Sequence, residues 1–316
     1  VTGYGKGALN HAAQILRQGG LVAFPTETVY GFGGDGFNPQ AAKKIYEAKG
    51  RPSDNPLILH ISKREELDAI AARIPETAEK LMDAFWPGPM TLIFEKTKAV
   101  PYETTGGLDT VAVRMPSHEG ARQLIESAGV PVAAPSANTS GRPSPTTAEH
   151  VKEDLWGRID MIIDGGPVGI GVESTIIDVT EETPTILRPG HITKDMIAKV
   201  IGTVQMDAGL SGLDPSVKPK APGMKYRHYA PKASMTVIQG EKEAVIRRIE
   251  ELAAEYPKEK VGILAADETL SCYTHGQVVS AGSRNEHTIE QALKTVSNNW
   301  NSNSTRNLFN NSYLRM

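Results

Sequence analysis

The sequence contains almost no cysteine, no long apolar run and little net charge. Of its 316 residues only Cys272 is a cysteine, which excludes an internal disulfide and a thiolate metal cluster. No apolar run approaches the roughly 20 residues that span a bilayer, and no charged-then-apolar signal is found. A net charge of −3 argues against a general nucleic-acid coat. These absences predict a cytoplasmic globular protein.

Several catalytic motifs are also absent. The sequence has no G-x-x-x-x-G-K-[ST], no G-x-S-x-G and no H-E-x-x-H, so it offers no anchor for a P-loop ATPase, a hydrolase or a zinc enzyme. Residues 31–36 do fit G-x-G-x-x-G, which favours a rival interpretation as an NAD-dependent oxidoreductase. Two details weaken it: residues 25–28 separate the expected strand from Gly31, and Asp54 lies in an expected loop rather than at a strand end.

Hydrophobic periodicity predicts a strand-rich mixed α/β domain that ends near residue 205. Asn38 and Pro39 are typical of a helix start and Gly50 of a helix end, so we expect a helix over 39–49. Apolar spacing predicts another helix over 64–74. We expect one further helix to end near 19–20, another to end near 85 and a third to cover 117–129. Strands are expected over 21–25, 56–61, 90–94, 111–115, 130–135, 161–164, 174–179 and 184–188.

The rest of the chain divides into a linker and a smaller unit. Residues 215–232 carry four prolines, five Lys or Arg and no acid, which predicts an extended segment. We expect it also to contact ligand, because a plain spacer does not need the run Tyr-Arg-His-Tyr at 226–229. A strand over 235–240, a helix over 241–256 and a strand over 260–267 predict a βαβ-like domain, whereas residues 297–316 show no usable period.

Four cations stand near the ends of expected elements: Lys49, Arg51, Arg114 and Arg188. Arg114 alternates with apolar neighbours in its strand, so it projects from the opposite face, where a buried guanidinium needs a carboxylate or phosphate partner. The loop 134–145 adds short polar side chains and follows a strand, where open α/β sheets usually bind ligands. Together these residues predict a cleft for a polyanion of the triphosphate kind.

Six stretches, in this order, resemble motifs of the YrdC-type threonylcarbamoyl-AMP synthases. They are FPTETVYGFGGDG, AKGRPSDNPL, VRMP, APSANTSGRPSP, VESTIIDV and LRPG, and the resemblance covers residues 8 to about 205. HYAP and the smaller domain are typical of the long, two-domain form. The resemblance implies an α/β fold: a YrdC-like mixed twisted sheet with flanking helices over 1–205, a Pro/Lys-rich linker over 206–234 that contacts the active site, and a small Rossmann-like domain over 235–316.

The family makes threonylcarbamoyl-AMP from L-threonine, bicarbonate or CO2, and ATP, and releases pyrophosphate. Partner proteins then transfer the threonylcarbamoyl group to the adenosine beside the anticodon of ANN-decoding tRNAs. The resemblance therefore implies a nucleotidyltransferase, Mg²⁺ on the ATP phosphates, downstream transferase proteins as partners, and at most a weak tRNA contact. No protein nucleophile is required, because a threonine carbamate attacks the α-phosphorus while the protein positions substrates and neutralises charge.

Carried over residue by residue, the resemblance assigns positions to both substrates. It places L-threonine near Thr28, His60, Arg114, the backbone of Ala134, and Ser174. It places ATP near Arg51, Asn55, Thr110, Ser136, Asn138, Ser144, Arg188 and, from the linker, Tyr229. Lys49 and Arg51 form the family's catalytic Lys-x-Arg pair, and no side chain is assigned to a metal.

Residues 294–316 depart from the family, whose long form usually ends in a Gly-rich and then basic helical segment. The departure resembles a shifted reading frame and touches no assigned site residue. Two alternatives stay open: a carbamoyl-adenylate-forming domain as in hydrogenase maturation, although its zinc-finger and acylphosphatase regions are absent, and a non-catalytic RNA-binding module whose basic cleft grips a phosphate backbone. Nothing in the sequence requires more than a monomer.

Overall fold

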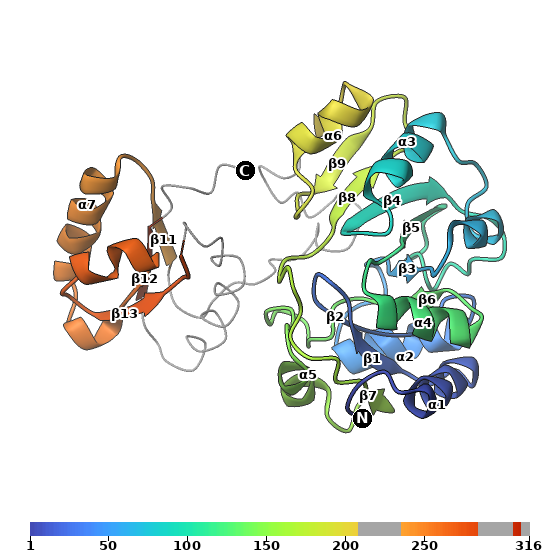
Figure 1. Cartoon of the computed structure of the whole chain (residues 1–316). Coiled ribbons are helices and arrows are strands. Elements are labelled where there is room, and N and C mark those ends of the chain that lie inside the picture. Colours follow the sequence, from blue (N-terminus) through green and yellow to red (C-terminus); the bar gives the residue numbers. More distant parts are fainter. Residues whose placement is uncertain (208–234, 284–305, 311–316) are drawn as a thin grey trace. The chain divides into compact units, whose positions relative to one another are not determined.

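The computed structural model describes residues 1–207, 235–283 and 306–310. They belong to two compact units, Val1–His228 and Tyr229–Met316, each with its own sheet (Figure 1). None of the helices in the described ranges is both long and apolar enough to cross a membrane. The predicted linker, 206–234, lies almost wholly outside these ranges, so its contact with the site stays a prediction.

The first unit is built on a ten-stranded sheet in the order β10-β9-β8-β4-β5-β3-β6-β2-β1-β7. The sheet is mixed, since β3 pairs parallel with β5 and β4 pairs antiparallel with β5. Its strands are β1 (Val22–Pro25), β2 (Tyr30–Asp35), β3 (Ile58–His60), β4 (Met90–Glu95), β5 (Thr110–Arg114), β6 (Val132–Ala133), β7 (Met161–Ile162), β8 (Thr175–Asp178), β9 (Thr185–Arg188) and β10 (Gln205–Met206). The predicted mixed α/β fold is confirmed.

Helices pack on both faces of this sheet. On one face α1 (Lys6–Arg17) and α4 (Glu119–Ala128) lie against each other and cover Val22, Phe24 and Val132. The other face carries α2 (Pro39–Lys49), α3 (Glu76–Phe85), α5 (Ala148–Leu155) and α6 (Lys194–Ile201), which pack on Ala23 and Val113 among others. Successive strand residues point to opposite faces, so each position in a strand fixes the face that its side chain reaches.

A third hydrophobic cluster contains residues of five strands and of no helix: Ile58, Ile93, Ala112, Ile176 and Leu187. His60, Thr91 and Arg114 lie two positions from members of this cluster on the same strands, so their side chains share its face. They also meet at one end of the sheet, because Arg114 pairs with His60 on β3 and with Thr91 on β4. The candidate site lies at this end.

Helix α2 begins and ends where the sequence predicts. The Asn38 side chain accepts a hydrogen bond from the backbone N–H of Gln40, and Pro39 occupies the first helical position. Gly50 ends the helix in the left-handed conformation, with φ of 65°. The predicted helix over 39–49 is confirmed, and its last residue, Lys49, is one of the predicted site residues.

The helix predicted over 64–74 is wrong. The structure has only a short 3-10 helix, η1 (Arg64–Ala69), in this region. Beyond it the chain pairs with the end of β4, because Ala71 forms a bridge with Lys96 and the Ala72 N–H donates to the Glu95 carbonyl. Apolar spacing found the buried positions, but pairing with a strand distant in sequence determined the backbone conformation.

The glycines at 31–36 lie mainly within a strand, which removes the dinucleotide-binding interpretation. Strand β2 spans Tyr30–Asp35 and pairs antiparallel with β1, so the motif forms no phosphate loop between a strand and a helix. A Cβ atom on Gly33 would lie 2.1 Å from the Ala133 carbonyl oxygen. The glycine is therefore required by close packing of neighbouring backbones.

The second unit is a small parallel α/β domain, as predicted. Its strands are β11 (Met235–Ile238), β12 (Val261–Ala265), β13 (Gln277–Ser280) and β14 (Arg306–Asn310), in the order β11-β14-β12-β13 with parallel pairs throughout. Helix α7 (Lys242–Ala254) packs on the sheet through Val245, Ile249 and Ala253, and η3 (Lys258–Lys260) and η4 (Asp267–Cys272) are short 3-10 turns. Strand β14 comes from the tail to which the sequence assigned no structure.

Candidate active site

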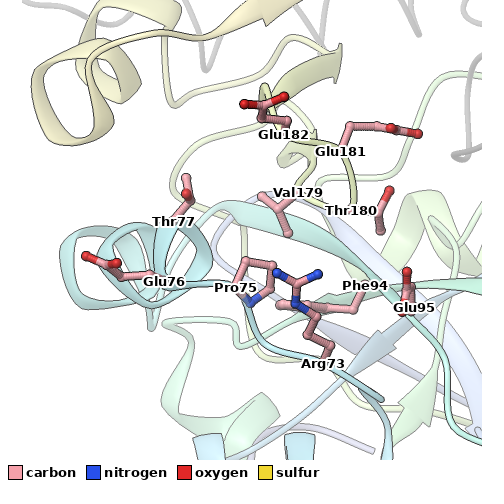
Figure 2. A pocket seen from close by; sticks show the side chains of 10 residues that line it. All are labelled: Arg73, Pro75, Glu76, Thr77, Phe94, Glu95, Val179, Thr180, Glu181 and Glu182. Carbon is pink, nitrogen blue, oxygen red and sulfur yellow. The ribbon is translucent and has the colours of Figure 1, made fainter.

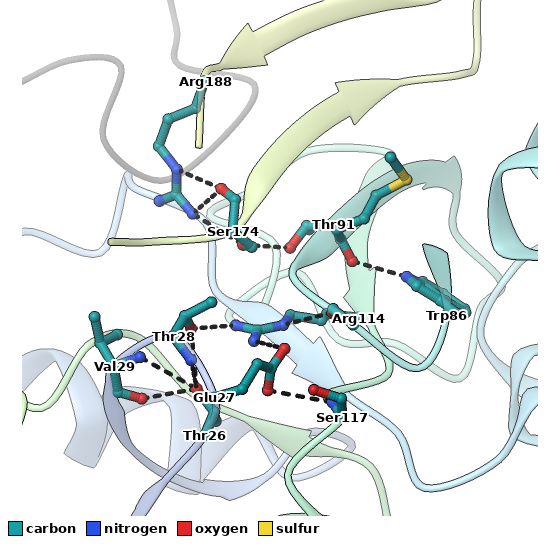
Figure 3. Close-up of polar contacts among 12 residues, drawn as sticks. Thr26, Glu27, Thr28, Val29, Trp86, Thr91, Arg114, Ser117, Ser174 and Arg188 are labelled. Carbon is teal, nitrogen blue, oxygen red and sulfur yellow. Dashed lines mark hydrogen bonds and ion pairs between the residues drawn. The ribbon is translucent and has the colours of Figure 1, made fainter. Parts of the chain in front are cut away.

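Arg114 makes several polar contacts at this end of the sheet (Figure 3). Its Nη2 lies 2.5 Å from Glu27 Oε1, its Nη1 donates to Thr28 Oγ1 at 2.9 Å, and its Nε donates to the Gly88 carbonyl at 3.3 Å. The residue is buried. The sequence predicted that Arg114 needs an anionic partner, and the structure identifies Glu27 as that partner within the chain.

The turn between β1 and β2 fixes Thr28 beside this guanidinium. The hydroxyl of Thr26 donates to the Val29 carbonyl at 2.8 Å and lies 3.0 Å from the hydroxyl of Thr28. The backbone carbonyls of residues 27 and 28 accept from the N–H groups of Ile170 and Gly171. The turn is therefore held by side-chain contacts within it and by backbone hydrogen bonds from residues 170 and 171.

His60 is a buried neutral imidazole next to Arg114. Its pKa is lowered from 6.5 to about 3, chiefly by burial and secondly by the adjacent charge of Arg114. Its Nδ1 lies 3.2 Å from the Ile58 carbonyl, and its ring packs edge-on against Phe24. A neutral imidazole offers hydrogen bonding without adding a second positive charge to the site.

Ser174 connects two predicted halves of the site. Its hydroxyl lies 2.7 Å from that of Thr91, which neighbours Arg114 across β4 and β5. The guanidinium of Arg188 donates to the same hydroxyl at 3.1 Å and to the Ser174 carbonyl at 2.9 Å (Figure 3). One serine thus links a residue assigned to ATP with the neighbourhood of residues assigned to threonine.

Lys49 anchors the loop 134–145. Its ammonium donates to the carbonyl oxygens of Ser136 at 2.7 Å and Asn138 at 2.9 Å, and to the Asn138 side-chain oxygen at 3.2 Å. Burial lowers the pKa of Lys49 well below its ordinary value, and the nearby charge of Arg51 lowers it further. In this structure the cation holds the loop, and its predicted direct contact with phosphate stays a prediction.

Arg51 and Asn55 form a second predicted pair. The Nη2 of Arg51 donates to the Asn55 carbonyl at 2.7 Å, and its guanidinium lies over the Tyr46 ring at 5.5 Å from the centroid. Asn55 is fully buried, and neither polar atom of its side chain has a hydrogen-bond partner among the described residues. A buried amide in this state is suited to receive a polar ligand group.

The structure thus brings most of the predicted residues together in groups. The first group, at one end of the sheet, contains Thr28, His60, Arg114 and Ser174. Beside it, the Ala134 N–H donates a hydrogen bond to the Ile58 carbonyl. The second group, on the loop 134–145 and the turn 49–55, contains Lys49, Arg51, Asn55, Ser136, Asn138 and the buried Ser144. Thr110 begins β5 at the end away from Arg114, and Tyr229 lies outside the described residues.

Two residues of this network were not predicted from the sequence. Glu27 lies inside the motif FPTETVYG, but its pairing with Arg114 depends on the fold. Thr91 lies on β4 and meets Arg114 only through the strand register. Of these two residues only Glu27 could have been predicted, because a buried arginine requires a carboxylate partner and the Glu27 carboxylate directly precedes Thr28.

A pocket of about 390 Å³ lies elsewhere in the first unit (Figure 2). It is lined by Arg73, Pro75, Glu76, Thr77, Phe94, Glu95, Val179, Thr180, Glu181 and Glu182, none of which is a predicted site residue. Four glutamates and one arginine make this pocket unsuited to a triphosphate. A second pocket, of about 470 Å³, borders Trp156 and also contains none of the predicted residues. The chemistry of the site therefore comes from the polar network described above.

Fold and site together define a class of protein. Arg114 and Arg188 supply positive charge, Thr28 and Ser174 supply hydroxyls, and His60 supplies a neutral imidazole. Such groups bind and orient anionic substrates through charge and hydrogen bonds. The class is an α/β protein with a polar site suited to anionic ligands.

Comparison with known proteins gives the particular family. The family model described as telomere recombination matches residues 14–190, and the model described as threonylcarbamoyl-AMP synthase, C-terminal domain, matches residues 192–310. Threonylcarbamoyl-AMP synthase of Pyrococcus abyssi is 55% identical over 81% of this chain and 75% of its own length. That of Bacillus subtilis is 52% identical over 86% of this chain and 78% of its own length.

The solved structures agree with these matches. A crystal structure of P. abyssi Sua5 complexed with L-threonine matches with a TM-score of 0.88 and 48% identity, covering 96% of this chain and 88% of that chain. The chain belongs to the threonylcarbamoyl-AMP synthase family, in its two-domain form. Its members by name form an adenylate, which makes this chain an enzyme of the nucleotidyltransferase type.

Proposed function

We propose that this protein condenses L-threonine, bicarbonate or CO2, and ATP to L-threonylcarbamoyl-AMP and pyrophosphate, for the threonylcarbamoylation of tRNA adenosine. Family membership supports this activity, as does a relative's crystal structure that contains L-threonine. The observation that carries the proposal is the continuity of the site. Ser174 joins Arg188, on the ATP side, to Thr91, the strand neighbour of Arg114 on the amino-acid side.

The threonine end is assigned to the network around Arg114. The planar guanidinium fork of Arg114 matches the α-carboxylate of an amino acid. The hydroxyls of Thr28 and Ser174 and the neutral imidazole of His60 supply hydrogen bonds to the remaining polar groups of threonine. The Ala134 N–H donates to the Ile58 carbonyl, and the same carbonyl lies 3.2 Å from His60 Nδ1.

The ATP end is assigned to Arg188, Arg51 and the loop that Lys49 anchors. Arg188 and Arg51 provide charge for the phosphates, and the buried amide of Asn55 has hydrogen-bonding capacity for the nucleotide. Ser136, Asn138 and Ser144 belong to the loop 134–145, Thr110 to the start of β5, and Tyr229 to the linker. Lys49 contributes by fixing the loop through its three carbonyl contacts.

The chemistry needs positioning rather than a protein nucleophile. The α-ammonium of threonine loses a proton, and the free amine adds CO2 with loss of a second proton to give a carbamate. One carbamate oxygen then attacks the α-phosphorus of ATP while pyrophosphate departs. Charge accumulates on the phosphoryl oxygens and on the leaving group, where Arg51 and Arg188 would neutralise it. Mg²⁺ would accompany ATP. No group of three or more His, Cys, Asp or Glu in the described ranges could hold a metal, so phosphate oxygens and water would be its ligands.

The partners and location stay proposals. Bicarbonate or CO2 and ATP are the co-substrates, downstream threonylcarbamoyl-transferase proteins consume the product, and any direct tRNA contact is weak. We expect a cytoplasmic monomer. A non-catalytic RNA-binding module is the alternative function, and strong salt-dependent RNA affinity without ATP turnover would favour it.

Pyrophosphate release tests the proposal directly. The full chain is incubated with ATP, Mg²⁺ and bicarbonate, with and without L-threonine, and with serine or alanine in its place. Release that depends on threonine and exceeds release with alanine is the expected result, because only threonine offers both the hydroxyl and the methyl group. Release that ignores threonine would point to another acceptor, and no release together with RNA binding would support the alternative.

A further inference from the structure

Glu27 is a carboxylate placed directly on the guanidinium that the proposed function reserves for the substrate carboxylate. Its Oε1 lies 2.5 Å from Arg114 Nη2, and its Oε2 accepts a hydrogen bond from the Ser117 N–H at 3.2 Å (Figure 3). The side chains of Arg114 and Glu27 are 4% and 14% exposed. The pair is therefore largely removed from water, and its charge balance matters for anything that binds there.

The charge balance of the pair distinguishes between kinds of ligand. Burial raises the pKa of Glu27, but Arg114 and the hydrogen bonds to the carboxylate lower it overall, so Glu27 is ionised at neutral pH. Arg114 and Glu27 together carry no net charge. A zwitterionic amino acid keeps the site neutral, whereas a carboxylate without an amine places two anions on one guanidinium.

We propose that Glu27 makes the Arg114 site selective for amino acids over carboxylates that lack an α-amine. Its carboxylate competes with a plain carboxylate for Arg114 and provides the negative charge that balances an α-ammonium group. This inference rests on the proposed function, since it takes Arg114 as the carboxylate-binding residue. Glu27 acts through Arg114 and through ligand charge, so it is a specificity-determining residue rather than a catalytic one.

A purely structural role is the competing explanation, and the contacts of the turn argue against it. The carbonyls of residues 27 and 28 are already held by the Ile170 and Gly171 N–H groups, and the Thr26 hydroxyl closes the turn on Val29. The Glu27 side chain is therefore not the main attachment of the turn. Glutamine has nearly the same shape and retains an oxygen for Arg114 or the Ser117 N–H, so E27Q removes the charge with little change in packing.

Calorimetric binding of two ligands to the full chain tests the proposal. The ligands are L-threonine and (R)-3-hydroxybutanoate, which lacks the amine. Wild type is expected to prefer threonine over 3-hydroxybutanoate by about tenfold or more. E27Q is expected to reduce this preference about tenfold or more, chiefly by binding 3-hydroxybutanoate more tightly. E27D retains the charge and should retain the preference.

Glu119 provides the matched control, because it is exposed in the first turn of α4 and E119Q changes the net charge by the same amount. E119Q should leave both affinities unchanged. If E27Q weakens both ligands equally, Glu27 is structural and the proposal is overturned. If wild type binds 3-hydroxybutanoate as tightly as threonine, the proposal is also overturned, and this result does not depend on the folding of any variant. Failure of the proposed function is distinguishable, because wild type would then bind no threonine at all.

Discussion

Replacement of Lys49 by methionine tests whether the loop 134–145 depends on a buried cation. The ammonium forms three hydrogen bonds to loop oxygens, at 2.7, 2.9 and 3.2 Å, from the last residue of α2. Methionine has a similar length and can fill the buried space, but it donates no hydrogen bond. Two backbone carbonyls and one side-chain oxygen would lose their donor together.

The size of the effect follows from these contacts. Hydrogen bonds to charged groups contribute about 1.5–3 kcal/mol each, and a buried acceptor without a donor costs about 1–3 kcal/mol. The unfavourable burial of the ammonium, which also lowers the pKa of Lys49, offsets part of this. We expect Lys49→Met to lower the free energy of unfolding by about 2–4 kcal/mol, which for a unit of this size lowers Tm by about 5–15 °C.

Thermal unfolding and steady-state pyrophosphate release together provide the assay. Because Ser136, Asn138 and Ser144 lie on the released loop, KM for ATP should rise about tenfold or more while KM for threonine changes less. The control is Lys44→Met on the same helix, where an exposed lysine donates to the Gly19 carbonyl at 2.7 Å and should contribute little. An unchanged Tm with lost activity would refute loop anchoring and favour direct phosphate contact by Lys49.

Three further changes test other parts of the site and fold. Arg51→Ala should reduce turnover on the order of 10²-fold, and a value within about threefold of wild type would contradict its role in charge neutralisation. The pKa of His60 is about 3 rather than the ordinary 6.5, so between pH 3 and 6.5 the unfolded state binds more protons than the folded state. The free energy of unfolding therefore falls as pH decreases from 6.5 towards 3, by up to about 1.4 kcal/mol per pH unit. His60→Gln should flatten this dependence in chemical unfolding, and an unchanged slope would refute the assignment. Gly33→Ala should lower the free energy of unfolding by about 3 kcal/mol or more, because its Cβ would lie 2.1 Å from the Ala133 oxygen. Gly31→Ala, whose Cβ would have its nearest contact at 3.4 Å, should retain most of the Tm. Equal effects of the two changes would contradict this packing argument.

Elements that depend on local chemistry could be predicted from the sequence. Helix α2 has a capping asparagine, a proline at its first position and a terminal glycine, all within thirteen residues, and the structure confirms both ends. The alternation that placed Arg114 opposite Val113 is likewise a local property of a strand, and Val113 lies in the main core as expected.

Elements that depend on distant pairing could not be predicted in this way. Ala71 leaves the helical path because it meets Lys96 beyond the end of β4, and no local signal announces that bridge. Strand β14 lies between β11 and β12 although its own sequence is polar and irregular. The glycines at 31–36 satisfy a regular expression, yet Gly33 is required because β6 approaches β2 closely there. In each case the neighbouring chain determined the conformation.

The same distinction applies to the site. The motifs gave the residues that the family resemblance assigns to the substrates, because those residues lie within short recognisable stretches. Thr91 has no such stretch, and it joins the network only because β4 pairs with β5 and β8 in a particular register. Glu27 lies in a motif, but its importance follows from the position of Arg114, 87 residues away in the sequence. Strand register and long-range pairing therefore define the residues that hold those assigned to the substrates.

The contacts within the site also explain how its guanidinium groups can be pre-organised. Arg114 is held by Glu27 and Thr28, and Arg188 by Ser174. Each guanidinium is therefore oriented before any substrate binds, which reduces the entropy lost on binding and the reorganisation needed as charge develops. An entering anion must therefore share or displace the partners of each guanidinium. A guanidinium that is held tightly consequently discriminates between ligands. A zwitterion at Arg114 preserves the charge balance of the Arg114–Glu27 pair and therefore leaves no buried charge unpaired.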